Sequence, residues 1–136
     1  MPIRDLDTDQ KFAATASGDE VVVSAGAGSG KTRLLVGRYL YLLSAKRVPL
    51  SSVVAITFTN KAADQMKSRI AARAQKLAHE YPDDKAFWLD EVAARIHTAP
   101  ISTIHSFCNS ILRNYPVESA LDPLFTIADD TTLSGL

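Results

Sequence analysis

Apolar and polar residues follow one another along this chain in blocks that favour an α/β fold. Three short apolar runs rich in β-branched residues predict strands at 21–24, 53–58 and 101–104. The middle run is nearly continuous, which is typical of a strand buried on both faces of a parallel sheet. Helical periodicity separates the runs, so we expect a doubly wound parallel sheet, with the first strand leading into a loop and a helix.

Helix-start residue types and prolines mark where the helices begin and end. Helices are predicted over 5–17, from residue 31 to about 45, from 59–60 through 77, over 85–97, and from about 107 to 115. In the longest, one face carries the apolar side chains of Ala63, Met66, Ile70, Ala74 and Leu77. The basic residues on its other faces are typical of a solvated surface: Lys67, Arg69, Arg73 and Lys76. Residues 122–128 are expected to form a loop and a short extended piece.

Composition narrows the class of protein. The chain has 136 residues, which suits one domain, and its formal net charge of zero gives no global case for nucleic-acid binding. Cys108 is the single cysteine and lies among apolar neighbours, so we expect a buried thiol in a reducing compartment. The charged N-terminus is unlike a signal peptide and no apolar run is long enough to span a membrane, so a cytoplasmic protein is expected.

The loop after the first predicted strand has the composition of a phosphate-binding loop. Glycines let backbone N–H groups turn toward a phosphate, and the helix that follows adds its unpaired N-terminal donors. A lysine then supplies charge for the β- and γ-phosphates of ATP, and a threonine hydroxyl suits Mg²⁺. The alternative is a Gly/Ser turn that only happens to precede Lys-Thr. The residues of this loop are Ala25, Gly26, Ala27, Gly28, Ser29, Gly30, Lys31 and Thr32, with alanine at the position usually held by the first glycine.

Three further side chains are placed by the predicted elements near this loop or at strand ends. Gln10 lies one turn into the first helix, where it is either a solvated residue or an amide able to read an adenine edge. Phe58 ends the second strand and is either a core residue or an exposed platform for stacking a base. His105 follows the third strand, where ligands of parallel sheets gather, although a lone histidine is more often structural.

One acidic pair invites a different interpretation. Asp90-Glu91 follows Phe-Trp-Leu and could be taken for the acidic strand end that holds Mg²⁺ in nucleotide hydrolases. The preceding run is short, lacks β-branched residues and continues in helical phase. We therefore expect a solvated helix face.

Taken together, four segments resemble motifs of superfamily 1 DNA helicases. Residues 6–10 resemble the Q motif, 25–32 resemble motif I including its tolerated alanine, 56–63 resemble motif Ia, and 102–107 resemble the Thr-x-His segment. Their order and spacing are similar to the UvrD/Rep/RecB/AddA group, and residues 101–108 and 122–129 look most like the AddA/RecB branch. The resemblance covers essentially residues 1–136 and implies a P-loop, RecA-like fold: the first motor domain with the start of its insertion.

The resemblance also implies a role for each matched residue. Gln10 and Arg33 would lie at the adenine, while Lys31 and Thr32 would hold the phosphates and Mg²⁺. Phe58, Thr59, Asn60, Thr103 and His105 would line the path of single-stranded DNA near a duplex junction. Such enzymes couple ATP hydrolysis to 3′-to-5′ movement in DNA repair or recombination. The implied partners are the remaining helicase polypeptide, a nuclease domain and a partner subunit.

The later motifs of that group, including its acidic Mg²⁺-binding motif, have no counterpart here. We therefore expect an N-terminal portion that binds ATP and is inactive in hydrolysis and unwinding by itself. The alternatives are a free-standing, non-catalytic nucleotide-binding module and a small P-loop kinase. Motif Ia and the Thr-x-His segment argue against the kinase.

Overall fold

A computed structural model describes residues 2–18, 20–26, 28–122 and 124–127. The chain divides into two compact units, Met1–Thr103 and Ile104–Leu136. In these described ranges the first unit holds three α-helices and a small parallel sheet, and the second holds one α-helix. The architecture is therefore a mixture of helices and strands, as the hydrophobic pattern predicts.

The three α-helices of the first unit begin close to where the sequence predicts. Helix α1 spans Thr8–Thr15 and starts with a capping box, in which Asp7 accepts from the Gln10 backbone N–H and the Gln10 side chain reaches back to Asp7. Helix α2 spans Lys31–Ser44 and α3 spans Asn60–Glu80. The Thr59 side chain caps α3 by accepting from the backbone N–H of Ala62 at 3.1 Å.

Strands β1 (Ala55–Thr57) and β2 (Ile101–Thr103) pair in parallel. Their register sets Thr57 opposite Thr103, so both strands end at the same edge of the sheet. The predicted parallel pairing of these two runs is confirmed. Strand β1 is shorter than the predicted 53–58, and its Ile56 is 46% exposed, so the prediction of a strand buried on both faces is wrong.

The prediction of a first strand over 21–24 is also wrong for this structure. Residues 21–24 form no strand, and the side chains of Val21, Val22 and Val23 are exposed, that of Val22 by 85%. A strand needs a neighbouring edge to hydrogen-bond with, and within the described residues β1 and β2 pair only with each other. The residues of this apolar run have high β-propensity, but propensity alone does not supply the partner strand that hydrogen bonding requires.

The predicted α-helix over 85–97 is replaced by a π-helical segment and a 3₁₀ turn. Two 3₁₀ turns, η2 (Pro82–Asp84) and η4 (Ile96–Thr98), flank the π-helical segment η3 (Phe87–Ala93). Its buried residues are Trp88 and Val92. Asp90 and Glu91 are exposed, and Glu91 forms an ion pair with Arg95 at 2.6 Å, which confirms the solvated face.

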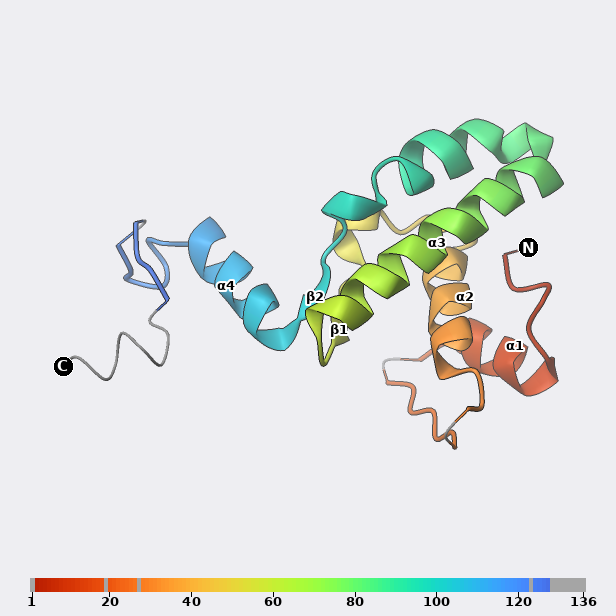
Figure 1. The fold of residues 1–136 in the computed structure, drawn as a ribbon, viewed down its shortest axis with the longest axis horizontal. Helices are drawn as coiled ribbons and strands as arrows, with labels where there is room; N and C mark the ends of the chain where they lie inside the picture. Colours follow the sequence, from red (N-terminus) through yellow and green to blue (C-terminus); the bar gives the residue numbers. More distant parts are fainter. Residues whose placement is uncertain (1, 19, 27, 123, 128–136) are drawn as a thin grey trace. The chain divides into compact units, whose positions relative to one another are not determined.

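The core of the first unit lies around α3. Its apolar face is buried as predicted, with Ile70, Ala74 and Leu77 fully inaccessible to solvent. Figure 1 shows η3 running beside α3 on one side, with α2 crossing on another and α1 lying beside α2. Another short 3₁₀ turn, η1 (Leu50–Ser52), precedes β1.

A second, smaller apolar cluster fixes the N-terminal segment to α2. It contains Ile3, Leu6, Ala14 and Leu34. Leu6 packs so closely on Gly37 of α2 that a Cβ on this glycine would lie 2.8 Å from the Leu6 Cδ1. Arg38 of α2 donates to the carbonyls of Ala13, Ala14 and Ala16 and so caps the end of α1.

In the second unit, α4 spans Ile104–Asn114 and is followed by turns. Its Arg113 guanidinium lies over the Phe125 ring, 4.8 Å from the centroid. Cys108 is exposed, so the predicted burial of this thiol is wrong, because no helix face of the described second unit covers it. Part of the loop predicted over 122–128 lies outside the described residues, and the part that is described forms no strand. No helix in the described ranges combines the length and the apolarity that crossing a membrane requires.

Candidate functional site

The phosphate-binding loop predicted from the sequence turns directly into α2. Gly28 and Gly30 have φ values of 75° and 82°, in the left-handed region that favours glycine. Gly30 is the N-cap of α2, which begins at Lys31. The loop is tightened by the Ser29 hydroxyl, which donates to the carbonyl of Gly26 at 2.7 Å. Ala27 lies outside the described residues.

The charged group of Lys31 lies within this loop. Its Nζ donates to the carbonyl oxygens of Ala25 at 3.0 Å and Gly26 at 2.7 Å. Thr32 follows in the first turn of α2, where backbone N–H groups have no partner within the helix, and its side chain is exposed. A cationic amine, free helix N-terminal donors and an exposed hydroxyl are the groups that a Mg²⁺-bound triphosphate requires, so the residues present fit this ligand.

Gln10 lies beside the loop, as its predicted place in the first helix required. Its Nε2 donates to the carbonyl of Ser29 at 3.1 Å, and its Oε1 lies 3.4 Å from the backbone N of Asp7. A Cβ at Gly30 would lie 2.8 Å from the same Nε2, so the amide and the glycine approach closely. The amide therefore joins α1 to the loop, and its contact with adenine stays a prediction.

Gln10 and Lys31 border one pocket of about 330 Å³. The wall also includes Val23, Ser24 and Ala25 from the segment that leads into the loop. Two carboxylates, Asp7 and Asp9, lie at the same pocket, and Asp7 is engaged in the cap of α1. Lys31 supplies the positive charge of this wall. The structure thus brings together Gln10, Ala25, Ser29 and Lys31.

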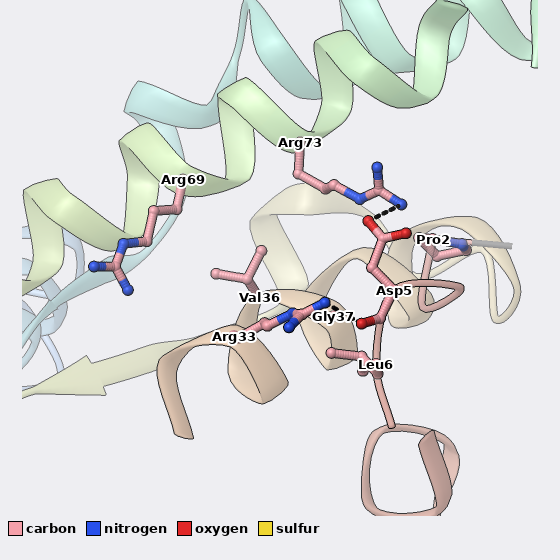
Figure 2. A pocket seen from close by; sticks show the side chains of 8 residues that line it. All are labelled: Pro2, Asp5, Leu6, Arg33, Val36, Gly37, Arg69 and Arg73. Carbon is pink, nitrogen blue, oxygen red and sulfur yellow. Dashed lines mark hydrogen bonds and ion pairs between the residues drawn. The ribbon is translucent and has the colours of Figure 1, made fainter. Parts of the chain in front are cut away.

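Arg33 is not at this pocket. Its guanidinium donates to the backbone carbonyl of Asp5 and lines a second pocket with Arg69 and Arg73 of α3 (Figure 2). The sequence places Arg33 one residue after the loop, but that side chain leaves α2 on a different face from the loop. Arg33 and Gln10 are predicted to lie at the same base, but in this structure they line different pockets.

The candidate DNA-contacting residues after β1 are exposed. The Phe58 side chain is 104% exposed relative to its reference state, so the core-packing alternative is wrong. Thr59 caps α3 and its carbonyl accepts from the Thr57 hydroxyl at 2.9 Å, while Asn60 is the first, exposed residue of α3. Thr103 is brought to the same sheet edge by its pairing with Thr57.

His105 belongs to the second compact unit, so its predicted level with Phe58 stays a prediction. It is exposed in the first turn of α4. Across the described ranges, His, Cys, Asp and Glu side chains form no group of three that could hold a metal ion.

Sequence reasoning missed the second pocket. It gives Asp5, Arg69 and Arg73 no role and predicts a solvated surface for both arginines. The four-residue spacing of Arg69 and Arg73 was the available signal, because it places them on one face of a helix. No local pattern points to Asp5, which meets Arg73 only through the fold.

Comparison with known proteins matches this chain to one family and to several curated relatives. Residues 6–136 match the family model described as the UvrD/REP helicase N-terminal domain. An ATP-dependent helicase/nuclease subunit from Thermoanaerobacter sp. (strain X514) is 40% identical over 125 residues, which cover 90% of this chain and 10% of that protein. The corresponding helicase/nuclease subunits from Heliobacterium modesticaldum and Pediococcus pentosaceus are 35% and 39% identical over 95% and 96% of the chain.

These matches cover 9% of the Heliobacterium protein and 11% of the Pediococcus protein. The chain thus spans about a tenth of the length of these curated relatives. The family model, in contrast, matches all but the first few residues of the chain. The chain therefore belongs to the UvrD/REP helicase N-terminal domain family.

Proposed function

We propose that this chain is the ATP-binding portion of an ATP-dependent 3′-to-5′ DNA helicase or translocase of DNA repair or recombination. In this proposal residues 1–136 are the N-terminal part of the first motor domain, with the start of its insertion. The observation that carries the proposal is the position of the Lys31 amine, held 2.7–3.0 Å from the carbonyls of Ala25 and Gly26 in the loop that precedes α2.

ATP and Mg²⁺ are the proposed cofactors. Lys31 and the first-turn N–H groups of α2 would bind the phosphates, and the Thr32 hydroxyl would be a ligand of Mg²⁺. The loop residues from Ala25 to Gly30 would surround the phosphates with backbone N–H groups. The bound metal would neutralise phosphate charge, and this chain's part is to hold the triphosphate in one orientation.

Gln10 is proposed to sense the adenine while it remains attached to the loop through Ser29. For Arg33 to lie at the same base, its guanidinium would have to exchange the Asp5 carbonyl for the nucleotide. That exchange breaks one charge-assisted hydrogen bond, which a stacked base would have to replace.

The complete sheet is proposed to be the doubly wound, P-loop type. Strand β1 has β2 on one side, and its Val54 and Ile56 neighbourhood carries exposed apolar side chains. Val21–Val23 are exposed in the same way. Burying these side chains between further strands of a longer polypeptide would turn residues 21–24 into a strand and remove the open sheet edge.

Single-stranded DNA is the proposed macromolecular partner. The fully exposed Phe58 ring at the end of β1, beside the polar side chains of Thr59 and Asn60, is suited to stacking a base of any sequence. Thr103, at the same sheet edge, and His105 would extend this path. The relatives are named helicase/nuclease subunits, which supports a nuclease domain and a partner subunit for the parent protein. The cytoplasm is the location that we propose for it.

ATP hydrolysis by the longer protein distinguishes a helicase from a regulatory module, because the module would bind ATP without hydrolysing it. We propose that the 136-residue chain binds ATP without motor-rate turnover, because Asp90 and Glu91 lie on the exposed face of η3. The test measures ATP turnover with and without single-stranded DNA, for this chain alone and extended to the length of its relatives. DNA-stimulated turnover only in the extended protein, abolished by Lys31→Ala, is expected. An extended protein that binds ATP and never hydrolyses it would favour the regulatory module.

A further inference from the structure

The pocket that contains Arg33 has a composition unlike that of the phosphate loop. It encloses about 300 Å³ between the N-terminal segment, α2 and α3. Leu6 and Val36 give it an apolar side, and three arginines line it: Arg33, Arg69 and Arg73. The guanidinium of Arg69 extends away from those of Arg33 and Arg73 (Figure 2). Neither Lys31 nor Gln10 lines the pocket.

The charges of this pocket are not balanced. Among the described residues, Asp5 is its one lining carboxylate against three guanidinium groups. Arg73 is largely neutralised, because its side chain is 14% exposed and forms ion pairs with Asp5 at 3.0 Å and Glu80 at 2.9 Å. Arg33 donates to the backbone carbonyl of Asp5, which carries no net charge. Arg33 and Arg69 therefore give the pocket an excess of positive charge.

Arg69 is the cation that is least engaged. Its side chain is exposed, and among the described residues its guanidinium has no ion-pair or hydrogen-bond partner. The Arg73 Nη2, although 3.0 Å from the Asp5 carboxylate, is buried without a well-aligned acceptor. A buried donor without an acceptor is costly, so this group would gain from an additional oxygen ligand.

We propose that the Arg33–Arg69–Arg73 pocket is a binding site for a phosphoryl anion, separate from the phosphate loop. Guanidinium groups present paired N–H donors whose geometry matches phosphate oxygens. The apolar side formed by Leu6 and Val36 limits competing water, which strengthens these interactions. A compact pyrophosphate and a phosphodiester of a nucleic-acid strand share this chemistry. Lys31 does not line this pocket, so the anion does not need the phosphate loop for its binding.

The first experiment titrates the 136-residue chain with inorganic pyrophosphate and follows the arginine Nε–Hε signals by NMR. Binding at this pocket shifts the signals of Arg33, Arg69 and Arg73 together and leaves that of Arg95 unchanged. Arg95 lies on the exposed face of the first unit and is paired with Glu91, so it serves as the internal control. If none of the three pocket signals moves, the proposal is overturned.

Substitutions make the assignment specific. Arg69→Gln removes a cation without breaking an ion pair and should weaken pyrophosphate binding by about tenfold or more, the effect of losing a charge-assisted contact. Arg95→Gln, with the same change of charge, should leave the affinity unchanged. Asp5→Asn should strengthen binding several-fold because it releases Arg73. Equal weakening by Arg69→Gln and Arg95→Gln would indicate a general charge effect and overturn the proposal.

Two further arms identify the source of the anion and separate this site from the loop. An oligothymidylate that shifts the same arginine signals more strongly than pyrophosphate would assign the pocket to a DNA backbone. The reverse order would assign it to a compact phosphate, and either result supports the site. Binding that disappears in Lys31→Ala but persists in Arg69→Gln would place the anion at the phosphate loop and overturn the proposal.

Discussion

The side-chain amide of Gln10 donates a hydrogen bond to the backbone carbonyl of Ser29, 3.1 Å away. This bond connects the N-terminal turn of α1 with the loop that precedes α2. Because the same side chain also closes the capping box of α1, the position of the loop depends on the folding of α1. Loop geometry and the N-terminal segment are therefore one structural unit.

Removing this amide should loosen the loop. Gln10→Ala is expected to weaken Mg-ATP binding several-fold, since a hydrogen bond of this kind contributes about 1 kcal/mol. Titration with a fluorescent ATP analogue measures the effect. Lys11→Ala, at the adjacent exposed position of α1, is the control and should bind like the parent chain. Equal affinities of the Gln10 and Lys11 variants would contradict a role for this amide.

The close approach of Leu6 to Gly37 gives a prediction opposite to helix propensity. In an open helix position Gly→Ala stabilises by about 1 kcal/mol. Gly37→Ala should instead destabilise the first unit by roughly 1–3 kcal/mol, because the new Cβ would lie 2.8 Å from the Leu6 Cδ1. Urea unfolding monitored by Trp88, the only tryptophan, measures the change.

A second substitution tests whether the clash is the cause. In the Leu6→Ala background, Gly37→Ala should cost much less or become stabilising, since the blocking methyl group is gone. If Gly37→Ala is equally destabilising with and without Leu6, the close contact is not responsible.

Burial should make the stability depend on alkaline pH through Tyr39. Burial raises the pKa of the Tyr39 hydroxyl to about 12, and this hydroxyl donates to the carbonyl of Val53. In the unfolded chain the pKa is about 10. Between these values the folded state holds a proton that the unfolded state has lost, so folding stability falls as pH rises, by about 1.4 kcal/mol per pH unit.

Below pH 10 this group should make no contribution to the pH dependence. Tyr39→Phe is expected to flatten the decline between about pH 10 and 12, at the expense of one hydrogen bond at neutral pH. Urea unfolding across that range compares the two proteins. Parallel alkaline declines would show that another group is responsible.

Substitution of Phe58 should change DNA affinity without changing the stability of the fold. Its ring is fully exposed, so Phe58→Ala should leave the unfolding midpoint unchanged. Base stacking contributes about 1–3 kcal/mol per base, so the same change should weaken oligothymidylate binding about tenfold or more. Phe12→Ala removes another exposed ring, 78% accessible on α1, and should not affect DNA affinity. Equal losses in both variants would argue against a site at Phe58.

The elements that the sequence predicts best are those whose stabilisation is local or amphipathic. The buried face of α3 follows from the spacing of Ala63, Met66, Ile70, Ala74 and Leu77. The caps at Asp7 and Thr59 follow from residue type. The start of α2 at Lys31 follows from the glycines before it, and nucleotide binding by the loop stays a prediction. The caps need contacts only within a few residues, and the face of α3 that is buried can be read from its own periodicity.

The elements that it predicts poorly depend on partners elsewhere. Residues 21–24 have strand propensity, but pairing requires an edge that no local pattern describes. The π-helical turns of η3 have no signal in the apolar spacing, because Trp88 and Val92, four residues apart, would share one face of an ordinary helix as well. The arginine pocket joins residues from three separate segments, so it emerges only when Asp5 meets Arg73.

The central claim is that the loop around Lys31 binds Mg-ATP. Calorimetric titration of the 136-residue chain with Mg-ATP tests it directly, beside Lys31→Ala and a Lys46→Ala control at an exposed position two residues after α2. Saturable binding that is retained in Lys46→Ala and lost in Lys31→Ala is the predicted result. Binding of equal strength in all three proteins, or in none of them, would contradict the account.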